Sequence, residues 1–450
     1  MELAGRNVLI IGMGKTGFVT ARFLAGRNVR IIVTDEKPRQ ALEDSLREPA
    51  GLRNDVEVRE YETGCLSGVD LVVPSPGVPP FNSILREAVK RNIPIVSEIE
   101  LAFRFLAIPL IAITGTNGKT TTTTLIGDLL KGCGKKVFVG GNIGDPLIGY
   151  VGGIQTDDYA VVEVSSFQLQ WTEQFHPIIS VLLNTTCDHV NYHGSFEAYR
   201  RTKERIFANQ TGTDFAILNA DEPSSQTLAK RLTARVKYFS SSRKVEEGIF
   251  LNHETLVAVG SPGMREEYPV DMVKIPGKHN LENVMATILA ARESGCEPAD
   301  IIATVANFRG LPHRIEFAGE KNGITFYDDS KGTNVDAVVR ALETFSAPIV
   351  LLMGGRDKEG DFQALSPLVE KKVKALVLFG EAREKIHRVL GKTVSTTLSA
   401  TLGDAVRIAH TKASPGDIIL LSPGCASFDE FTDYKARGRF FKDRVRDLIS

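Results

Sequence analysis

The sequence predicts an α/β protein built from three domains in series. Its 450 residues far exceed the usual size of one domain, about 100–150 residues. Short β-branched runs alternate with helical patterns along almost the whole chain, as expected for parallel strands joined by crossover helices. Glycine is abundant, at 40 residues, so we expect many sharp turns or many places where backbone comes close to a ligand.

The expected strands fall into three groups along the chain. In order, they are 7–11, 29–34, 69–75, 109–113, 136–140, 159–164, 178–184, 324–327, 348–353, 374–379 and 417–422. The polar stretch 239–274 is expected to form short strands and turns that cover the surface. Domain boundaries are expected near residues 97 and 309, which gives domains 1–97, 98–309 and 310–450.

The composition excludes several classes of protein. Lys and Arg (54) nearly balance Asp and Glu (55), so no strong field recruits nucleic acid or an anionic membrane. The five cysteines are widely spaced, with no C-x-x-C pair, which argues against a disulfide framework and a zinc knuckle. No apolar run approaches the roughly 18 residues of a membrane-spanning helix. We therefore expect a protein of the reducing cytoplasm.

A glycine-rich loop follows the first expected strand. Gly12, Gly14 and Gly17 form G-x-G-x-x-G before a helical pattern, and Asp35 ends the next strand. Such glycines let a diphosphate approach a helix N-terminus, and the acid can accept a hydrogen bond from a ribose. The pattern makes the first domain Rossmann-like, with a nicotinamide dinucleotide as the obvious ligand. A tight strand–helix turn without any ligand is the alternative.

A second loop, GTNGKT at 115–120, opens the central domain. It follows the strand 109–113 and precedes a helical pattern. Its backbone N–H groups can surround phosphate oxygens, while Lys119 neutralises charge and the Thr120 hydroxyl reaches Mg²⁺. The standard P-loop pattern needs a glycine where this chain has Ile113. A P-loop ATPase-like domain with ATP bound is favoured, and a Gly-Lys-Thr turn without ligand is the alternative.

Three further residues, Glu163, His189 and Lys203, could support a metal near this loop. Glu163 ends one expected strand and His189 follows another, and the carboxyl ends of parallel strands meet at one edge of a sheet. Both can therefore approach a P-loop Mg²⁺. On chemistry alone His189 is better interpreted as a hydrogen-bonded loop residue. Lys203 is interpreted as a solvated helix lysine, since its segment also carries Arg200 and Arg201.

The third expected domain carries four loops with cations or small polar residues. They are GLPHRIEF (310–317), DDSKGTN (328–334), MGGRDK (353–358) and SPGCASFDEF (422–431). Arg314, Lys331 and Lys358 suit phosphates or carboxylates. Each cation taken singly is more often a surface residue, but four such loops in one Rossmann-like domain indicate a ligand site.

Seven segments together identify a family resemblance. They are TGTNGKT (114–120), GGNIG (140–144), EVSSFQL (163–169), CDHVNYHGSFEAYRRTK (187–203), GKHNLENVMA (277–286), LPHR (311–314) and DDSKGTN (328–334). In this order they resemble the Mur ligase family, the ATP-dependent amide-forming enzymes of cytoplasmic peptidoglycan synthesis. The glycine-rich first domain, Ser75–Gly77 and CASFDEF are most similar to the member that adds D-glutamate to UDP-N-acetylmuramoyl-L-alanine.

The resemblance replaces the nicotinamide with another ligand. It implies that the first glycine loop holds the diphosphate of the UDP-linked muramoyl substrate. The residues implied for this substrate are Gly14, Lys15, Thr16, Asp35, Glu36, Lys37, Ser75, Gly77, Asn142 and His189. Members often carry Thr-Arg where this chain has Glu36-Lys37, so the uracil contacts of that pair are the least supported.

The resemblance also implies the remaining sites. ATP would contact Gly115, Thr116, Asn117, Gly118, Lys119, Thr120, Thr121, Asn280, Asn283, Arg314, Asp329 and Lys331. D-Glutamate would contact Thr333, Lys358, Ser427 and Tyr434, the last standing where a phenylalanine is expected. Two Mg²⁺ ions would be held by Thr120, Glu163, His189 and Lys203, with Lys203 converted by CO₂ to a carbamate. The implied catalytic set is Lys119, Glu163, His189 and Lys203.

The resemblance implies a reaction of two steps. It also implies that the enzyme is a monomer. The L-alanine carboxylate attacks the γ-phosphate of ATP, and the D-glutamate amine then displaces phosphate from the acyl phosphate. The rival classes are an NAD-dependent oxidoreductase, which has no evident use for GTNGKT, and a regulatory nucleotide-binding protein. The latter would hold ATP without releasing phosphate in response to an amino acid.

Overall fold

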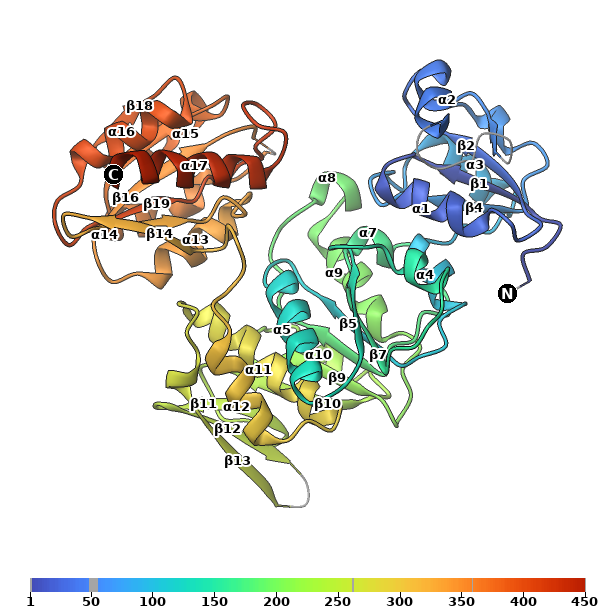
Figure 1. Cartoon of the computed structure of the whole chain (residues 1–450), viewed down its shortest axis with the longest axis horizontal. Helices are drawn as coiled ribbons and strands as arrows, with labels where there is room; N and C mark the ends of the chain where they lie inside the picture. Colours follow the sequence, from blue (N-terminus) through green and yellow to red (C-terminus); the bar gives the residue numbers. More distant parts are fainter. Residues whose placement is uncertain (1, 48–55, 261–262, 358, 450) are drawn as a thin grey trace. The chain divides into compact units, whose positions relative to one another are not determined.

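The computed structural model describes residues 2–47, 56–260, 263–357 and 359–449. The chain divides into two compact units: Met1–Met272 with Glu282–Ala306, and Val273–Leu281 with Asn307–Ser450. The first unit contains two sheets and the second contains one (Figure 1). Most strand pairs are parallel, so the predicted α/β class with three mostly parallel sheets is confirmed.

The first sheet has the strand order β3-β2-β1-β4 and is parallel throughout. Its strands are β1 (Asn7–Ile11), β2 (Arg30–Thr34), β3 (Val56–Val58) and β4 (Leu71–Pro74). Its helices are α1 (Lys15–Leu24), α2 (Arg39–Arg47), α3 (Ser83–Lys90) and the 3₁₀ turn η1 (Thr63–Leu66). Leu24 of α1 and Leu85 of α3 belong to different apolar clusters on the two faces, as in doubly wound folds.

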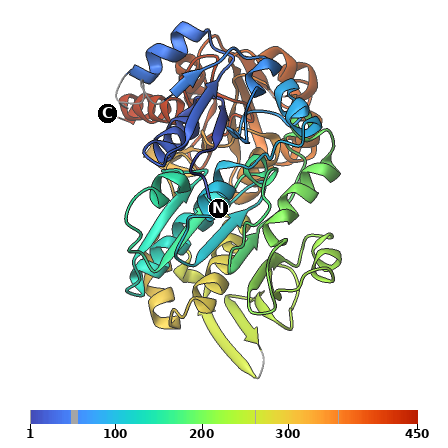
Figure 2. The same ribbon diagram turned by 90° about the vertical axis from the view of Figure 1, so that its right-hand side faces the viewer.

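The central sheet has nine strands in the order β13-β12-β11-β10-β9-β8-β5-β7-β6. They are β5 (Leu110–Thr114), β6 (Val137–Gly141), β7 (Tyr159–Glu163), β8 (Ile179–Leu182), β9 (Phe215–Asn219), β10 (Arg235–Ser240), β11 (Gly248–Asn252), β12 (Thr255–Gly260) and β13 (Met264–Pro269). The stretch 239–274 does form short strands. Strand β11 pairs with β10 in parallel, and β12 and β13 follow by antiparallel pairing, so these strands extend the sheet and do not lie over its surface (Figures 1 and 2).

The helices of the central region begin at α4 and end at α12. They are α4 (Glu98–Phe103), α5 (Lys119–Gly132), α6 (Leu147–Val151), α7 (Ser166–Leu169), α8 (Val190–His193), α9 (Phe196–Glu204), η2 (Arg205–Phe207), α10 (Ser225–Ala229), η3 (Val270–Met272), α11 (Lys278–Glu293) and α12 (Pro298–Asn307). Side-chain hydrogen bonds fix where several of these helices begin. Ser165 and Gln168 form a capping box at α7, which satisfies backbone N–H groups that have no partner in a first helical turn.

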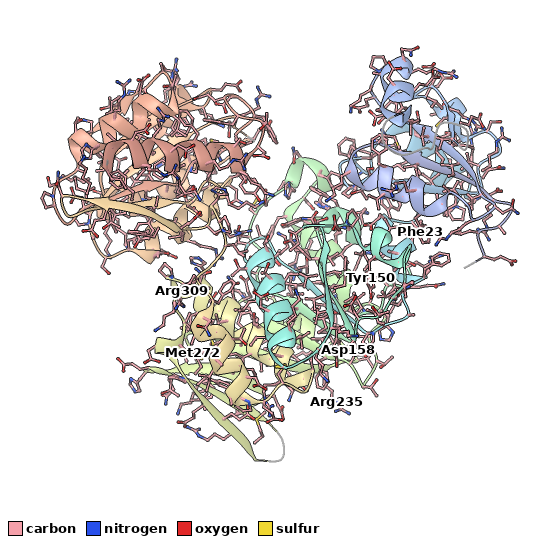
Figure 3. All side chains as sticks on the ribbon, viewed as in Figure 1. Phe23, Tyr150, Asp158, Arg235, Met272 and Arg309 are labelled. Atoms are coloured by element: carbon pink, nitrogen blue, oxygen red, sulfur yellow. A yellow bond between two sulfur atoms is a disulfide. The ribbon has the colours of Figure 1, made fainter. Side chains whose placement is uncertain are left out.

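Aromatic packing joins the first two sheets. Helices α1 and α6 lie against each other, and Phe23 and Tyr150 mark this region in Figure 3. The Phe23 ring meets Phe105 edge-on at 5.1 Å between centroids, and Tyr150 stacks on Phe138 at 4.4 Å. The apolar cluster of the first sheet therefore continues into the central one.

The second unit contains a six-stranded sheet in the order β14-β15-β19-β16-β17-β18. Its strands are β14 (Glu316–Lys321), β15 (Ile324–Asp328), β16 (Ile349–Gly354), β17 (Val373–Phe379), β18 (Thr396–Leu398) and β19 (Ile418–Leu421). Its helices are α13 (Val335–Thr344), η4 (Phe362–Leu365), α14 (Ser366–Lys372), α15 (Arg383–Leu390), α16 (Leu402–Lys412) and α17 (Tyr434–Ile449). Helices α13 to α15 and helices α16 and α17 contribute to separate apolar clusters.

One cysteine pair corrects the expectation drawn from spacing. Cys133 and Cys296 form a disulfide, with Cα atoms 5.7 Å apart, and are 163 positions apart in sequence. They follow helices α5 and α11, whose ends the fold brings together. Cys65, Cys187 and Cys425 are free. Spacing excluded a dense disulfide framework but not a single pair made by tertiary structure.

Candidate active site

The loop after β5 is shaped by the loop after β8. The Asn184 side chain accepts a hydrogen bond from the Asn117 N–H at 2.9 Å and donates to the Asn117 carbonyl at 3.1 Å. The Thr116 N–H donates to the Asn184 carbonyl at 3.0 Å. Asn184 is therefore a site residue that the sequence did not indicate, because a lone Asn after a strand carries no distinguishing signal.

Glycine is required at the turn into α5. Gly118 has a φ of 86° and is the N-cap of the helix, a conformation that favours glycine. A Cβ there would lie 2.2 Å from the Asn283 amide oxygen. Asn283, on α11, is nearly buried. The fold thus places one of the two asparagines expected to contact adenine directly against the 115–120 loop.

Two lysines converge on one carbonyl oxygen in this loop. Lys119 Nζ donates to the carbonyls of Gly115 and Thr116, each at 2.9 Å. Lys203 Nζ donates to the same Gly115 carbonyl at 2.7 Å. Lys203 is 1% exposed, so its interpretation as a solvated helix lysine is wrong.

Burial shifts the ionisation of Lys203 towards the neutral form. It lowers the pKa of the Lys203 amine well below its ordinary value, and the charge of Lys119 lowers it further, against opposing effects of Asp188 and Glu163. The ring of Tyr199 lies 4.6 Å from Lys203 Nζ. Burial thus favours the neutral form of this amine, which is the nucleophilic form.

A carboxylate, a hydroxyl and an amide meet beside these lysines. The Thr120 hydroxyl donates to Glu163 Oε2 at 2.7 Å, and the Asn142 side chain donates to Glu163 Oε1 at 2.8 Å. Glu163 ends β7 and is 3% exposed. The oxygens of Thr120 and Glu163 are ligands that Mg²⁺ accepts, so this corner fits a divalent cation held beside nucleotide phosphates.

His189 lies at the edge of the same group. It caps α8 with a left-handed φ of 52°, and its ring meets Phe167 edge-on at 4.8 Å. Its ring centroid is 6.3 Å from that of Tyr199, whose hydroxyl lies 3.2 Å from the Thr116 hydroxyl. The loop position predicted for His189 is therefore found, next to groups that surround the second glycine loop.

The first glycine loop meets two predicted partners. Asp35 accepts from the Met13 N–H at 2.6 Å and from the Lys37 N–H at 3.0 Å. The Ser75 hydroxyl donates to the Gly12 carbonyl at 2.6 Å. A Cβ at Gly17 would lie 2.2 Å from the Gly12 carbonyl oxygen. The loop, the acid and the serine thus form one group.

The other residues predicted for the first domain are more scattered. Lys15 Nζ donates to the Gly144 carbonyl at 2.6 Å and pairs with Asp145 at 3.2 Å, both exposed and in the loop after β6. Glu36 accepts from the Tyr61 hydroxyl at 3.3 Å. A Cβ at Gly14 or Gly77 would meet no atom within 4 Å, so backbone there is open to a ligand. The Thr16 carbonyl accepts from Thr20.

The loops of the second unit also gather. Asp329 accepts from the Ser422 hydroxyl at 2.7 Å, and burial raises the pKa of Asp329 to about 7. Lys331 Nζ lies 4.0 Å from the centre of the Tyr434 ring. The Thr333 N–H bonds the Lys331 carbonyl at 2.8 Å, and Ser427 is 2% exposed. Lys358 lies outside the described residues.

Two buried groups of the second unit were not predicted as site residues. Arg437 is fully buried. It donates to the Ser330 hydroxyl and carbonyl and to the Cys425 carbonyl, at 2.8–3.1 Å, so it ties two loops together. His313 Nδ1 lies 2.7 Å from Asp328 Oδ2. No spacing rule identifies an arginine that acts from the middle of a helical pattern.

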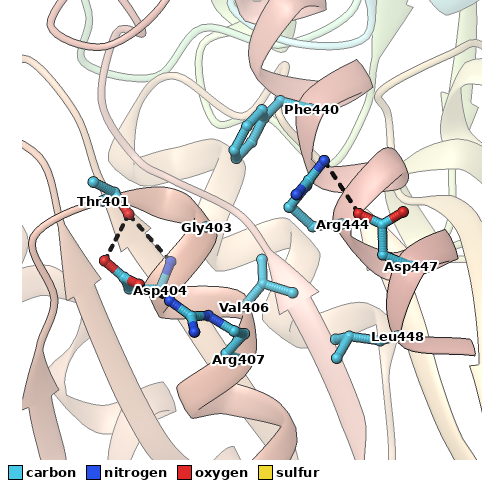
Figure 4. A pocket seen from close by; sticks show the side chains of 9 residues that line it. All are labelled: Thr401, Gly403, Asp404, Val406, Arg407, Phe440, Arg444, Asp447 and Leu448. Atoms are coloured by element: carbon cyan, nitrogen blue, oxygen red, sulfur yellow. Dashed lines mark hydrogen bonds and ion pairs between the residues drawn. The ribbon is translucent and has the colours of Figure 1, made fainter.

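Two further features of the second unit carry ionisable side chains. His313, Asp328 and Glu316 cluster within reach of one ion, but Lys442 already pairs with Glu316 at 2.8 Å. A hollow of about 420 Å³ lies between α16 and α17 (Figure 4). Its arginines, Arg407 and Arg444, pair with carboxylates on their own helices. Neither feature adds a ligand site.

The remaining predicted ATP residues are placed as follows. Thr121 is buried in the first turn of α5. Asn280, in the first turn of α11, donates to the Pro276 carbonyl at 2.6 Å, and Arg314 follows His313 in the second unit.

No helix among the described residues is both long and apolar enough to cross a membrane.

Solved structures of low sequence identity share the fold. A MurF ligase from Thermotoga maritima, described in complex with ADP, superposes with a TM-score of 0.62 at 16% identity, over 96% of this chain and 99% of that one. The UDP-N-acetylmuramate–alanine ligase MurC from the same organism gives 0.58 at 18%, over 98% and 99%. At this identity the likeness concerns the fold alone.

Family models and sequence relatives give closer matches. Residues 6–97 match a Mur ligase MurD-like N-terminal domain, 113–291 a Mur ligase middle domain and 313–425 a Mur ligase glutamate ligase domain. A UDP-N-acetylmuramoylalanine–D-glutamate ligase from Syntrophus aciditrophicus is 58% identical over 99% of both chains. One from Geobacter metallireducens is 43% identical over 100% of this chain and 99% of the relative. The chain belongs to the Mur ligase family.

Proposed function

We propose that this chain joins D-glutamate to UDP-N-acetylmuramoyl-L-alanine with consumption of ATP, releasing ADP and phosphate, as a step of cytoplasmic peptidoglycan precursor synthesis. Full-length relatives of 58% and 43% identity bear that activity in their names. The observation that carries the proposal is the convergence of Lys119 and Lys203 on the Gly115 carbonyl beside the Thr120–Glu163 pair, because this arrangement suits phosphoryl transfer.

Mur ligases use ATP, and the loop 115–121 fits its phosphates. The N-terminus of α5 and the Lys119 ammonium would stabilise their negative charge. Asn280 and Asn283 would contact the adenine, Asp329 the ribose, and Arg314 and Lys331 the phosphates. Asn283 supports this assignment through its closeness to Gly118.

Mg²⁺ fits the Thr120–Glu163 corner. The hydroxyl and carboxylate oxygens there lie 2.7 Å apart and suit a hard cation. His189 and a carbamate on Lys203 would complete a second site. When bound, the two ions would neutralise charge on the phosphoryl oxygens.

Carbamate formation on Lys203 follows from its burial. The neutral amine attacks the carbon of CO₂, a C–N bond forms, and one proton is released to give the carbamate anion. The product would be an oxygen ligand where an ammonium would repel a cation. The lowered pKa of this amine supports the step, since only the neutral form attacks.

The muramoyl substrate would lie along the first glycine loop and reach Asn142. Gly14, Lys15, Thr16, Asp35, Glu36, Lys37, Ser75 and Gly77 would hold its nucleotide part, and Asn142 and His189 the muramoyl part. The open backbone at Gly14 and Gly77 supports a close approach. The hydrogen bond from the Met13 N–H to the Asp35 carboxylate supports a role for Asp35 at the turn.

D-Glutamate would be held by the second unit. Thr333, Lys358, Ser427 and Tyr434 would bind its carboxylates, and Arg437 would keep their loops in register. We place the functional boundaries at 1–97 for the UDP substrate, 98–309 for ATP and 310–450 for the amino acid. The active form is proposed to be a monomer.

Different residues of the chain would act in the two steps of the reaction. Lys119 holds the phosphates while the L-alanine carboxylate displaces ADP, and Lys331 meets the transferred phosphoryl group. His189 orients the acceptor or assists deprotonation of the D-glutamate amine as it attacks the acyl carbon and phosphate leaves. Fixed cations around a water-poor site lower the barrier because they need not reorganise.

The direct test is phosphate release in the presence of ATP and UDP-N-acetylmuramoyl-L-alanine. D-Glutamate, L-glutamate, L-lysine and diaminopimelate are supplied in turn. Stimulation by D-glutamate alone is expected. Stimulation by a diamino acid would assign the chain to a different reaction of the family, and ATP binding without stimulation would favour a regulatory nucleotide-binding protein.

A further inference from the structure

A hydrogen bond from a tyrosine hydroxyl joins the loop after β4, in the first sheet, to the turn that carries His189. The Tyr192 hydroxyl donates to the Val78 carbonyl at 3.0 Å. Val78 lies just beyond Ser75–Gly77, in the loop after β4, and Tyr192 lies on α8. The two residues are 114 positions apart in sequence, so tertiary structure alone creates the contact.

The Tyr192 ring is held firmly on the central side. It packs against Phe167 with centroids 4.3 Å apart and against His193 at 4.8 Å. Phe167 also supports the His189 ring at 4.8 Å, so one aromatic residue contacts both. Burial raises the pKa of Tyr192, which keeps its hydroxyl protonated and able to donate.

The α8 turn is anchored at a second point. His193 Nε2 lies 3.0 Å from the Ser166 hydroxyl, next to Phe167. Helix α8 spans only four residues, Val190–His193, which is too short to be rigid alone. Its orientation, and with it that of the capping His189, therefore depends on these side-chain contacts.

On the other side, Val78 is connected to the first glycine loop. The Val78 N–H donates to the Ser75 carbonyl at 3.0 Å, and the Ser75 hydroxyl donates to the Gly12 carbonyl at 2.6 Å. A Cβ on Gly12 would lie 3.1 Å from Ser75 Cβ. A change in the glycine loop must therefore move Ser75, and with it Val78.

We propose that Tyr192 is a positioning residue that couples the UDP-substrate loop 75–78 to the placement of His189. The inference rests on the proposed function for the identity of the substrate and extends it with a residue to which no role had been assigned. Through the Tyr192 hydroxyl, substrate held by the first glycine loop orders the His189 turn. Conversely, a well-placed turn favours binding of the UDP substrate, because coupling between sites is reciprocal.

The test is Tyr192→Phe, which removes the hydroxyl and keeps the ring on Phe167. We expect the KM for UDP-N-acetylmuramoyl-L-alanine to rise about 3- to 10-fold, since a lost hydrogen bond typically changes an equilibrium by this order. The kcat should fall by about 3-fold or more, while the KM for ATP stays within twofold. Tyr238→Phe, on β10, is the matched control and should change none of these constants.

Two readouts separate coupling from a merely structural role. The Kd of UDP-N-acetylmuramoyl-L-alanine, measured by calorimetry without ATP or D-glutamate, should weaken in Tyr192→Phe and stay unchanged in Tyr238→Phe. The thermal unfolding midpoint should be similar in both variants. If Tyr192→Phe lowers only the midpoint, or leaves KM, kcat and Kd within twofold of the wild type, the proposal is overturned.

Failure of the proposal and failure of the proposed function give different results. A wild-type chain without D-glutamate-stimulated phosphate release contradicts the proposed function. The Kd comparison between the two tyrosine variants still tests the coupling in that case, because binding of the UDP substrate needs no turnover. Equal Kd values in the two variants, in an active enzyme, contradict the coupling alone.

Discussion

The two glycine loops of the first unit have the same local plan and different surroundings. Each follows a parallel strand and opens a helix, at Gly14 and at Gly118. The Gly12–Gly17 loop is contacted by neutral groups and by the Asp35 carboxylate, and its one cation, Lys15, is exposed and pairs with Asp145. The 115–120 loop is surrounded by two lysine amines and a nearly buried glutamate. Glycine spacing thus predicts where phosphates bind. We propose that buried ionisable groups distinguish the loop at which a substrate reacts from the loop that only binds one.

The largest expected effect is at the charged loop. Lys119→Ala should reduce turnover by at least about 10²–10³-fold, because one preorganised charge is lost where negative charge develops. The fold should persist, because the Lys119 amine bonds carbonyls of its own turn. The measurement is D-glutamate-dependent phosphate release together with a thermal unfolding midpoint. Lys131→Ala, in the last turn of the same helix, is the control; substantial activity in Lys119→Ala would remove its phosphate role.

The next effect tests the buried amine. Lys203→Ala should lose about 10²-fold or more in turnover, and short carboxylic acids such as acetate should restore part of it by standing in for the carbamate. Omitting CO₂ and bicarbonate should lower wild-type activity and leave the variant unchanged. Phosphate release with and without acetate checks this. Absence of rescue with unaltered Mg²⁺ affinity would count against the carbamate.

The first loop should respond to substitution in a different way. Gly17→Ala places a Cβ 2.2 Å from the Gly12 carbonyl oxygen, so it should destabilise by about 1–3 kcal/mol through overpacking. Gly14→Ala meets nothing within 4 Å and has a φ of −77°, so its stability should change by less than about 0.5 kcal/mol. Gly14→Ala should instead weaken UDP-substrate binding.

Unfolding midpoints and the Kd of UDP-N-acetylmuramoyl-L-alanine distinguish these two glycines. If Gly14→Ala binds the substrate as well as the wild type does, the backbone there does not approach the diphosphate. If Gly17→Ala keeps its full stability, the close contact with Gly12 is tolerated by a shift of the helix.

The sequence predicted the plan of the fold better than the environment of its side chains. Strand 7–11 was found at Asn7–Ile11, because buried parallel strands are continuous apolar runs. Lys203 was misinterpreted because its neighbours in sequence are arginines, whereas its neighbours in space are Gly115 and Tyr199. The Asn184 and Arg437 contacts join segments distant in sequence, and no local pattern reports such pairs. The disulfide between Cys133 and Cys296 was missed for the same reason.

A buried acid at the junction of the two sheets should have the smallest effect on turnover. Glu98, on α4, is 1% exposed. It accepts from the Ile148 N–H at 2.8 Å and from the Gln168 side chain at 3.4 Å. Burial raises the pKa of Glu98 from 4.5 to about 7. Unlike the charges at 115–120, this acid faces no proposed ligand, so it tests whether buried ionisable groups outside the reacting loop affect stability alone.

The sign of the pH dependence follows from the raised pKa. Between pH 4.5 and about 7 the folded chain keeps a proton that the unfolded chain has lost, so this group's contribution to stability falls as pH rises through that window. Glu98→Gln cannot ionise and should escape the loss, gaining at most about 3 kcal/mol above pH 7, or a few degrees in unfolding midpoint. The difference between the midpoints of variant and wild type should therefore grow from pH 4.5 to 7 and then level off.

The exposed Glu254→Gln is the control, and phosphate release at saturating substrate should not change in either variant. A midpoint difference that is flat with pH would show that Glu98 is ionised in the folded chain, and a loss of turnover would extend the chemistry beyond the charged loop.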